Sequence, residues 1–310
     1  MIVALAGGTG AAKLLRGLAR ATDPARLLVV GNTGDDLEWW GLHVSPDLDS
    51  VAYALAGLLD PGRGWGVRDD TFECLGAMLR FGRETWFRLG DRDLATHLHR
   101  TLLLREGAPL SLVTRRVAEA LGVRAQLLPM SDDPVRTVLR TPAGWLTLEE
   151  FFVRERCGPT VREVAYRGAE AARPAPGVLD ALARAEAVVV CCSNPVTSIG
   201  PILAVPGIRA ALEASPAPVV AVSPIVGGRA VSGPAAQLLA ACGVEASALG
   251  VAQLYAPWLD ALVLDRVDAA LAPALERRGV HPVVADALMP DAEAELRLAQ
   301  VTLDAAGVAA

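Results

Sequence analysis

The sequence predicts an α/β fold in which a Rossmann-like parallel sheet is covered by helices. Three observations support this prediction. Short apolar segments of strand length, bounded by glycine, recur along the 310 residues. Stretches with helical spacing follow them. The strands alternate with helices, as is typical of a parallel sheet with helices on both faces.

The predicted strands and helices follow one another along the chain. Strands are expected at Met1–Ala6, Leu27–Val30, Ala187–Cys191, Val219–Val222 and Leu262–Leu264. Helices are expected at Ala11–Ala21, Val178–Ala185 and Pro234–Ala241. In an open parallel sheet, ligands bind outside the carboxyl ends of the strands, so functional residues are expected in the loops that follow them.

The pattern changes between about residues 61 and 173. Helices are expected there at Thr71–Phe81, Asp93–Arg105 and Leu112–Ala120, and an antiparallel pair at Val135–Arg140 and Gly144–Thr147. No linker rich in Gly, Ser or Pro brackets this region. We therefore predict a single domain, 1–310, with a mainly helical insertion at about 61–173 that covers the site at the carboxyl edge of the sheet.

Composition narrows the functional class. The chain is 52% hydrophobic, but no run reaches the roughly 18 apolar residues of a membrane helix, and no basic cluster precedes the first apolar segment as in a signal peptide. A cytoplasmic protein with no membrane partner is expected. The net charge of −6 provides no basic field for nucleic acid. The five cysteines form no C-x-x-C pair, which argues against a disulfide framework or a zinc site.

The first predicted strand ends in a glycine loop that is suited to phosphate. Gly7, Gly8, Thr9 and Gly10 are followed by Lys13, the only lysine in the chain. Loop N–H groups, the positive end of the next helix and one ammonium together form an anion-binding site. The spacing matches neither the Walker motif nor a full dinucleotide fingerprint. A tight strand-to-helix turn with a solvated lysine is the alternative that the loop alone leaves open.

Three further loops are expected at the same edge of the sheet. They begin at Gly31, Ser193 and Ser223 and are rich in Gly, Asn, Asp, Ser and Pro. Each could be simple turn chemistry. Their convergence on one edge favours a binding site.

Acidic pairs occur near these loops. Carboxylates beside bound phosphate repel it unless a cation lies between them, and Mg²⁺ is usually held by one or two carboxylates with phosphate oxygens and water. We therefore predict Mg²⁺ as cofactor, with Asp36 and Asp49 as its ligands. For Asp93 and Asp133 we favour helix capping instead.

Arginine and tryptophan side chains are also expected near these loops. Arg88 and Arg92 could bind phosphate or stack on a ring, whereas at least half of Trp39, Trp40, Trp65 and Trp86 are expected to pack in the core. His97 and His99 are two residues apart on a helix and should point to different faces, so they do not form a metal pair. No local motif suggests an activated nucleophile. These features favour transfer of a phosphorus-containing group by charge neutralisation and positioning.

In their order along the chain, these motifs resemble the 2-phospho-L-lactate transferase family, which makes the deazaflavin coenzyme F420. The segments that carry the resemblance span nearly the whole chain: Gly7–Gly10, Lys13–Leu18, Asn32–Asp36, Ser45–Asp49, Leu89–His97, Leu128–Pro134, Ser193–Pro195, Ser198–Leu203 and Ser223–Gly228. Two positions depart from the family pattern. Cys192 stands where proline is common, and Glu149 where glutamine is common.

The resemblance implies a reaction. The terminal ribityl hydroxyl of the deazaflavin FO attacks a lactyl- or enolpyruvyl-diphosphoguanosine donor, and GMP leaves with assistance from Mg²⁺. The resemblance leaves the choice between the two donors open, and also whether the protein forms a homodimer.

The resemblance also implies site residues. Asp49, Arg92 and Lys13 would be catalytic, with Asp49 and Arg92 beside the deazaflavin. Substrate contacts are implied for Gly7, Gly8, Thr9, Gly10, Asn32, Asp49, Arg88, Arg92, Ser193, Asn194, Ser198 and Ser223. The competing interpretation is a non-enzymatic regulator that binds a nucleotide sugar, from a related branch. The Leu89–Asp93 and Leu128–Pro134 segments argue against it, since they resemble the transferase branch.

Overall fold

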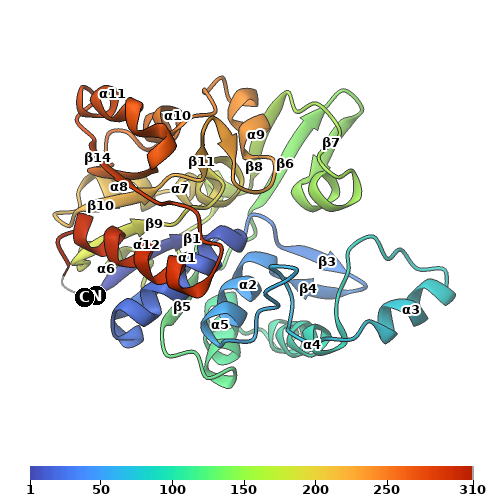
Figure 1. The fold of residues 1–310 in the computed structure, drawn as a ribbon. Coiled ribbons are helices and arrows are strands. Elements are labelled where there is room, and N and C mark those ends of the chain that lie inside the picture. Colours follow the sequence, from blue (N-terminus) through green and yellow to red (C-terminus); the bar gives the residue numbers. More distant parts are fainter. Residues whose placement is uncertain (309–310) are drawn as a thin grey trace.

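A seven-stranded parallel sheet forms the centre of the computed structural model, which describes residues 1–308 (Figure 1). The strand order is β14-β13-β10-β9-β1-β2-β5. The strands are β1 (Ile2–Ala6), β2 (Leu27–Gly31), β5 (Gln126–Pro129), β9 (Ala187–Val190), β10 (Val219–Val222), β13 (Ala261–Asp265) and β14 (His281–Ala285). The predicted fold class is confirmed, and all five predicted strands are present. The sequence prediction missed the two edge strands, β5 and β14.

Helices cover both faces of this sheet (Figure 1). The α-helices among the described residues are α1 (Gly8–Ala21), α2 (Pro46–Leu55), α3 (Glu73–Arg80), α4 (Asp91–Arg105), α5 (Leu110–Ala120), α6 (Val178–Ala183), α7 (Gly200–Ala204), α8 (Ile208–Glu213), α9 (Ala235–Ala241), α10 (Ala248–Tyr255), α11 (Ala272–Glu276) and α12 (Ala292–Ala305). Single turns of 3₁₀ or π type occur at Pro24–Arg26, Glu150–Arg154, Ala169–Ala171, Pro195–Ile199 and Arg266–Leu271. The predicted helices correspond to α1, α6 and α9 and, in the insertion, to α3, α4 and α5.

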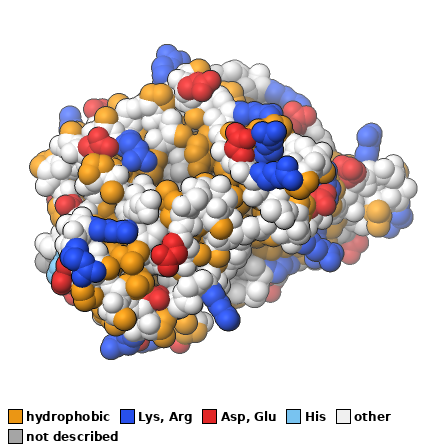
Figure 2. Space-filling model, turned by 90° about the horizontal axis from the view of Figure 1, so that it is seen from above, with side chains coloured by type: hydrophobic (Ala, Val, Ile, Leu, Met, Phe, Trp, Pro, Cys, Tyr) orange, Lys and Arg blue, Asp and Glu red, His pale blue; other side chains and the backbone are white. Residues whose placement is uncertain are grey.

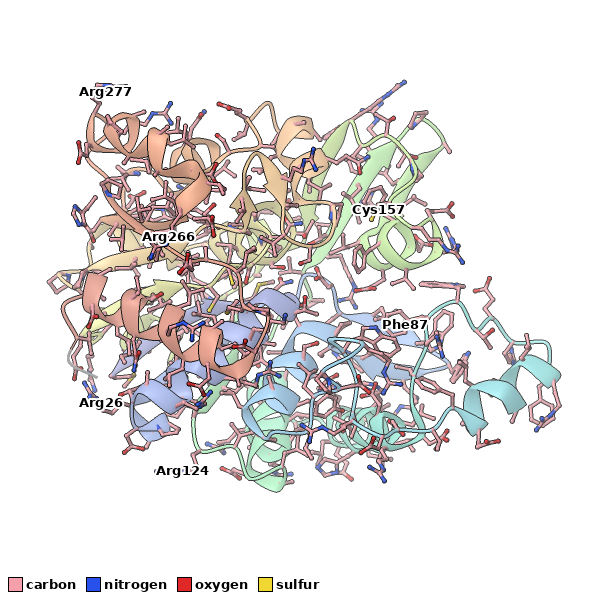
Figure 3. The ribbon with its side chains drawn as sticks, in the orientation of Figure 1. Arg26, Phe87, Arg124, Cys157, Arg266 and Arg277 are labelled. Carbon is pink, nitrogen blue, oxygen red and sulfur yellow. The ribbon has the colours of Figure 1, made fainter. Side chains whose placement is uncertain are left out.

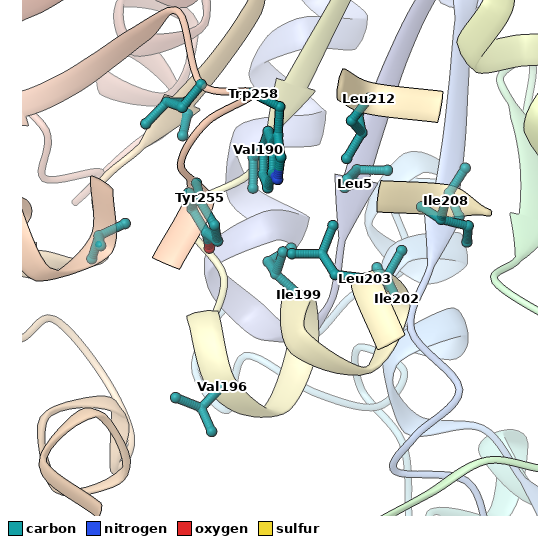
Figure 4. Packing of buried hydrophobic residues seen from close by; sticks show 14 of the residues in the cluster. Leu5, Val190, Val196, Ile199, Ile202, Leu203, Ile208, Leu212, Tyr255 and Trp258 are labelled. Atoms are coloured by element: carbon teal, nitrogen blue, oxygen red, sulfur yellow. The ribbon is translucent and has the colours of Figure 1, made fainter. Parts of the chain in front are cut away.

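The strands are apolar at consecutive positions because each face of the sheet has its own core. Ile2 and Ala4 of β1 pack with Leu14 of α1 and Leu298 of α12. Val3 and Leu5 point to the other face, where Leu5 lies among Val190, Ile202, Ile208 and Leu212 (Figure 4). Period-two alternation between two buried faces gives continuous apolar segments.

The region 61–173 contains both added elements and one strand of the main sheet. A small antiparallel sheet of order β7-β6-β8 is formed by β6 (Arg136–Thr141), β7 (Gly144–Thr147) and β8 (Glu163–Arg167). However, β5 pairs in parallel with β2 and is the edge of the main sheet. The added elements therefore form two segments rather than one continuous insertion. The sequence of β5, Gln-Leu-Leu-Pro, begins with a polar residue and ends with proline, so it lacks the continuous apolar pattern by which the equally short β9 and β10 were predicted.

Two short hairpins complete the fold. They are β3 (Leu37–Trp39) with β4 (Leu42–Val44), and β11 (Ile225–Val226) with β12 (Arg229–Ala230). In Figure 1, α3 and the chain around it project away from the sheet. Acidic, basic and apolar side chains are interspersed on the face shown in Figure 2. No helix among residues 1–308 is both long and apolar enough to cross a membrane.

Candidate functional site

A cavity of about 800 Å³ opens at the carboxyl edge of the main sheet. Its first wall, here called the sheet wall, consists of the loops that follow β1, β2, β9, β10 and β14 and of Asp47, which contacts the glycine loop from the first turn of α2. Its second wall, here called the helix wall, comes from the part of α2 beyond Asp47, from α4 and from the loops around Trp65 and Phe87, of which Phe87 is labelled in Figure 3. The location agrees with the general rule for ligand sites in open α/β sheets.

Most of the predicted site residues line this one cavity. They are Gly7, Gly8, Thr9, Gly10, Lys13, Asp49, Arg88, Ser193, Asn194, Ser198 and Ser223. Three predicted site residues, Asn32, Asp36 and Arg92, are absent from its lining. The structure thus brings together four loops that are far apart in the sequence, as expected from their convergence on one edge.

The glycine loop is tightly packed against the loop after β9 and against Asp47. The Gly7 N–H donates to Oγ of Ser193 at 3.1 Å, and the Gly8 N–H donates to Oδ1 of Asp47 at 2.7 Å. A Cβ at Gly10 would lie 2.5 Å from the carbonyl oxygen of Cys192. Close backbone approach therefore explains the glycine there. The N-cap residue Gly7 has no side chain, and Asp47 takes the N–H of Gly8, so the N–H groups of Thr9 and Gly10 in the first turn are left for a ligand in the cavity.

Lys13 is anchored at the rim of the sheet wall. Its Nζ donates to the carbonyl oxygen of Met289 at 3.0 Å, in the segment between β14 and α12. An ammonium has three donors, so two remain for a ligand. The alternative of a freely solvated lysine does not agree with this position.

Asn32 lies behind the sheet wall rather than on it. Its side chain is fully buried; Nδ2 donates to Oδ2 of Asp47 at 2.9 Å, and Oδ1 accepts from the N–H of Gly34 at 2.8 Å. The loop after β2 turns Asn32 toward Asp47, so that Asn32 supports Asp47. The substrate contact implied for Asn32 stays a prediction that this burial does not favour.

The carboxyl groups of Asp35, Asp47 and Glu149 face the cavity without a cationic partner. Burial, followed by repulsion from Asp47 and Glu149, raises the pKa of Asp35 well above its ordinary value. Burial raises the pKa of Asp47 to about 6, and burial with repulsion from Asp47 raises the pKa of Glu149 to about 8. Oδ1 of Asp35 is buried and has no hydrogen-bond partner. Such a cluster is stabilised by a cation.

The predicted metal ligands are engaged elsewhere. Asp36 accepts from Oγ of Ser45 at 2.9 Å and lies 2.9 Å from Nε2 of His43. Both carboxylate oxygens of Asp49 accept from the guanidinium of Arg100. Asp36 and Asp49 as metal ligands therefore remain a prediction that these contacts do not favour.

Asp35 and Asp47 fit Mg²⁺ better. Within residues 1–308 there is no ready-made set of three His, Cys, Asp or Glu ligands. Magnesium often binds one or two carboxylates and completes its shell with phosphate oxygens and water. Asp35 and Asp47 line the cavity beside the glycine loop, and the orphaned Oδ1 of Asp35 is available to a cation.

A buried polar network supports the helix wall. Tyr53 of α2 donates its hydroxyl to Oδ1 of Asp93 at 2.7 Å, and His97 Nε2 lies 3.2 Å from the same oxygen. Burial raises the pKa of Asp93, but His97 and Tyr53 outweigh this effect and leave the pKa below its ordinary value. Arg100 was missed in the sequence. The spacing of Asp93, His97 and Arg100, which puts them on one face of α4, is the signal that could have found it.

The prediction that Asp93 and Asp133 cap helices is wrong. The carboxylate of Asp70 accepts from the N–H groups of Arg92 and Asp93 and so caps α4, while Asp133 accepts from the N–H of Arg173. The carboxylates of Asp93 and Asp133 instead accept from distant parts of the chain, namely from Tyr53 and Arg173. The expectation for the histidines is confirmed, since His97 is buried and His99 is exposed.

Arg88 and Arg92 have different surroundings. Arg88 lines the cavity with its Cζ 4.7 Å from the ring centroid of Phe72. Arg92 is exposed, and its Nη1 donates to the carbonyl oxygen of Arg68 at 3.3 Å. Arg92 does not line the cavity, because its neighbour Asp93 takes the inward-facing position on α4. Its implied contact with the acceptor stays a prediction that this position does not favour.

The tryptophans divide as expected. Trp39, Trp40 and Trp86 pack together, with the rings of Trp39 and Trp86 4.7 Å apart. Only Trp65 of the four lines the cavity, where Arg63 lies 5.3 Å from its ring centroid. The helix wall thus offers Trp65 and Phe87 as flat apolar surfaces.

Comparison with known proteins identifies relatives along the whole chain. The family described as 2-phospho-L-lactate transferase CofD matches residues 2–303. A 2-phospho-L-lactate transferase of Methanosarcina mazei is 43% identical over 304 residues, which is 98% of this chain and 100% of the relative. A phosphoenolpyruvate transferase of Kitasatospora aureofaciens is 45% identical over 309 residues, with 97% and 96% of the two chains covered.

A solved structure shows the same fold. A crystal structure of a Bacillus halodurans protein superposes with a TM-score of 0.66 at 18% identity, and the match covers 97% of this chain and 98% of that chain. This likeness concerns the fold, whereas the sequence matches concern the family and its transferase activity. The chain belongs to the 2-phospho-L-lactate transferase family, CofD.

Proposed function

We propose that this protein transfers a phospholactyl or phosphoenolpyruvyl group from a guanosine-diphosphate-linked donor to the ribityl hydroxyl of the deazaflavin FO, releasing GMP, in coenzyme F420 biosynthesis. One observation carries this proposal: a single cavity of about 800 Å³ has a phosphate-binding type of loop on one wall and aromatic side chains on the other. Two substrates can therefore meet within it. The names of the relatives support the same class of reaction.

The sheet wall is the proposed donor side. The first-turn N–H groups of α1 and the remaining two donors of Lys13 would bind the diphosphate. Asp35 and Asp47 would hold Mg²⁺, which when bound neutralises phosphate charge and makes the phosphorus more electrophilic. Asn32 holds Asp47 in place through its amide. Without a cation, the clustered carboxylates would repel a diphosphate.

The helix wall is the proposed acceptor side. Trp65 and Phe87 offer surfaces against which a planar ring system can stack. Asp49 lies on the same wall and would orient the attacking hydroxyl. In the transfer, a bond forms between the ribityl oxygen and phosphorus, the phosphorus bond to the GMP oxygen breaks, GMP leaves with that oxygen, and the proton of the hydroxyl is released to water.

Direct transfer without a covalent enzyme intermediate agrees with the cysteines in the site. Burial raises the pKa of Cys192 to about 12 and the pKa of Cys191 well above its ordinary value. A thiol that stays protonated is a poor nucleophile. Cys192 instead donates through Sγ to the carbonyl oxygen of Gly10 at 3.3 Å.

Two measurements test this function. FO fluorescence titrated with protein should show saturable binding, whereas a pure nucleotide-sugar-binding regulator should leave it unchanged. Incubation of FO and Mg²⁺ with each donor, followed by mass spectrometry, should reveal a phospholactyl or phosphoenolpyruvyl adduct and GMP. Absence of any adduct with both donors would reject the proposal. The mass of the adduct also decides between the two donors. The relatives leave this choice open, since one is a 2-phospho-L-lactate transferase and the other a phosphoenolpyruvate transferase.

A further inference from the structure

Arg100 of α4 is the largest fully buried side chain among the described residues, with 1% of its surface exposed. Its guanidinium bridges both oxygens of Asp49, with Nη1 at 3.0 Å from Oδ2. This contact joins α4 to α2 beneath the helix wall. Asp49 itself lines the cavity and is buried apart from that side.

His97 fixes this pair from one side. Its Nδ1 lies 3.2 Å from Nη1 of Arg100 and 3.6 Å from Oδ2 of Asp49. Its Nε2 points to Asp93, which in turn accepts from the hydroxyl of Tyr53. Asp49, Arg100, His97 and Asp93 thus form one chain of contacts, and the guanidinium cannot turn without disturbing it.

Stability alone does not explain a buried ion pair of this kind. Removing two charges from water costs free energy that their attraction often only balances. The Nε of Arg100 is also buried without a hydrogen-bond partner, which adds to the cost. The ion pair must therefore contribute something other than stability. Of the carboxylates in this network that line the cavity, Asp49 is the one that Arg100 contacts directly.

We infer that Arg100 is a positioning residue: it fixes the orientation of the Asp49 carboxylate so that its free lone pairs face the acceptor side of the cavity. A carboxylate has about four acceptor sites, and the guanidinium fork uses two of them. One of the others accepts the hydrogen bond of the attacking hydroxyl and aims its oxygen at phosphorus. This inference rests on the proposed function and concerns the acceptor only.

The test replaces Arg100 by lysine in the full-length protein. Arg100→Lys keeps the positive charge but loses the planar fork that bridges both oxygens. We expect kcat with FO to fall on the order of 10²-fold, because small misplacements of reacting groups have effects of this size. Affinity for GDP, measured by calorimetry as a probe of the donor side, should stay unchanged.

A matched control removes a similar fork elsewhere. Arg16 of α1 bridges both oxygens of Glu295 in α12, and neither residue lines the cavity. Arg16→Lys should therefore keep kcat within about twofold of wild type. An equal fall of kcat in both variants, or a fall for Arg100→Lys that parallels lost GDP affinity, would overturn the inference.

A second variant covers the case in which Arg100→Lys does not fold. Asp49→Asn with Arg100→Gln removes both charges of this ion pair and retains hydrogen-bonding groups at both positions. If Arg100 acts only through Asp49, this double variant should be as slow as Asp49→Asn alone, since the two residues form one unit. A further tenfold loss in the double variant would contradict the inference. Wild-type protein that makes no adduct at all would reject the proposed function instead.

Discussion

The two walls of the cavity treat their carboxylates in opposite ways. On the helix wall, Asp49 is paired with Arg100, and Asp93 has Tyr53 and His97 as partners. On the sheet wall, Asp35 and Asp47 have no cationic partner and their pKa values are raised. The helix wall is therefore preorganised by the protein itself. The sheet wall lacks such partners for its carboxylates, which is why we propose Mg²⁺ there and not at Asp49.

Removal of the metal is the strongest way to test this contrast. In excess EDTA the transferase activity should fall on the order of 10³-fold, because a bound cation supplies several kcal/mol of charge stabilisation. Asp47→Asn should have a similar effect and should abolish Mn²⁺ binding measured by electron paramagnetic resonance. Asp36→Asn is the matched control, since its carboxylate is held by Ser45 and His43 and does not line the cavity. Full activity in EDTA would contradict the assignment.

The second test uses pH and the metal-free protein. The pKa of Asp47 is about 6 and that of Glu149 about 8 when folded, above their unfolded values near 4. The folded state then binds more protons than the unfolded state, so the free energy of unfolding decreases as pH rises from about 4 to about 8. The rise of about two pKa units at Asp47 alone corresponds to a loss of about 3 kcal/mol in the free energy of unfolding across this range.

Melting temperatures measured across that pH range check the sign. In EDTA the melting temperatures should fall with rising pH. With Mg²⁺ present they should fall less, since a bound cation stabilises the ionised carboxylates in the folded state. Glu149→Gln should flatten the upper part of the curve, near pH 8. A melting temperature of the metal-free protein that rises steadily between pH 5 and 8 would contradict the raised pKa values of the sheet-wall carboxylates.

The two walls also differ in how far the sequence predicts them. The sheet wall follows from local signals: the glycines and Lys13 come directly after β1, and Ser193 and Ser223 stand just beyond β9 and β10. Since the carboxyl ends of parallel strands meet at one edge of the sheet, the position of these residues directly after the strands was enough to predict that they lie together.

The helix wall depends on contacts between distant parts of the chain. Asp49 meets Arg100 across 51 residues, and which face of α4 turns inward decides between Arg92 and Asp93. The resemblance implies Asp49 and Arg92 beside the acceptor, but only the packing of α4 shows that Arg92 is exposed and that Asp93 is buried. The same holds for β5, whose place in the main sheet depends on pairing with β2.

Lys13 gives a smaller and more local test. Lys13→Ala should weaken donor binding by roughly the 1.5–3 kcal/mol of a charged hydrogen bond, because its ammonium lies at the sheet wall and keeps two free donors. FO binding should stay unchanged, since FO is assigned to the opposite wall. Calorimetry with GDP and fluorescence with FO separate the two. Equal loss of both affinities would show that the walls are not independent.

The smallest expected effect distinguishes Arg92 from Arg88. Arg92→Ala should change FO affinity and kcat by less than about twofold, as expected for an exposed side chain whose only polar contact is with a backbone carbonyl. Arg88→Ala should weaken FO binding more, because Arg88 lines the cavity and stacks on Phe72. Fluorescence titration of both variants under one condition gives the comparison directly. If Arg92→Ala proves the more damaging, the amino end of α4 must turn when the acceptor binds and bring Arg92 to the cavity, and the helix wall would then be completed by its ligand just as the sheet wall is completed by its cation.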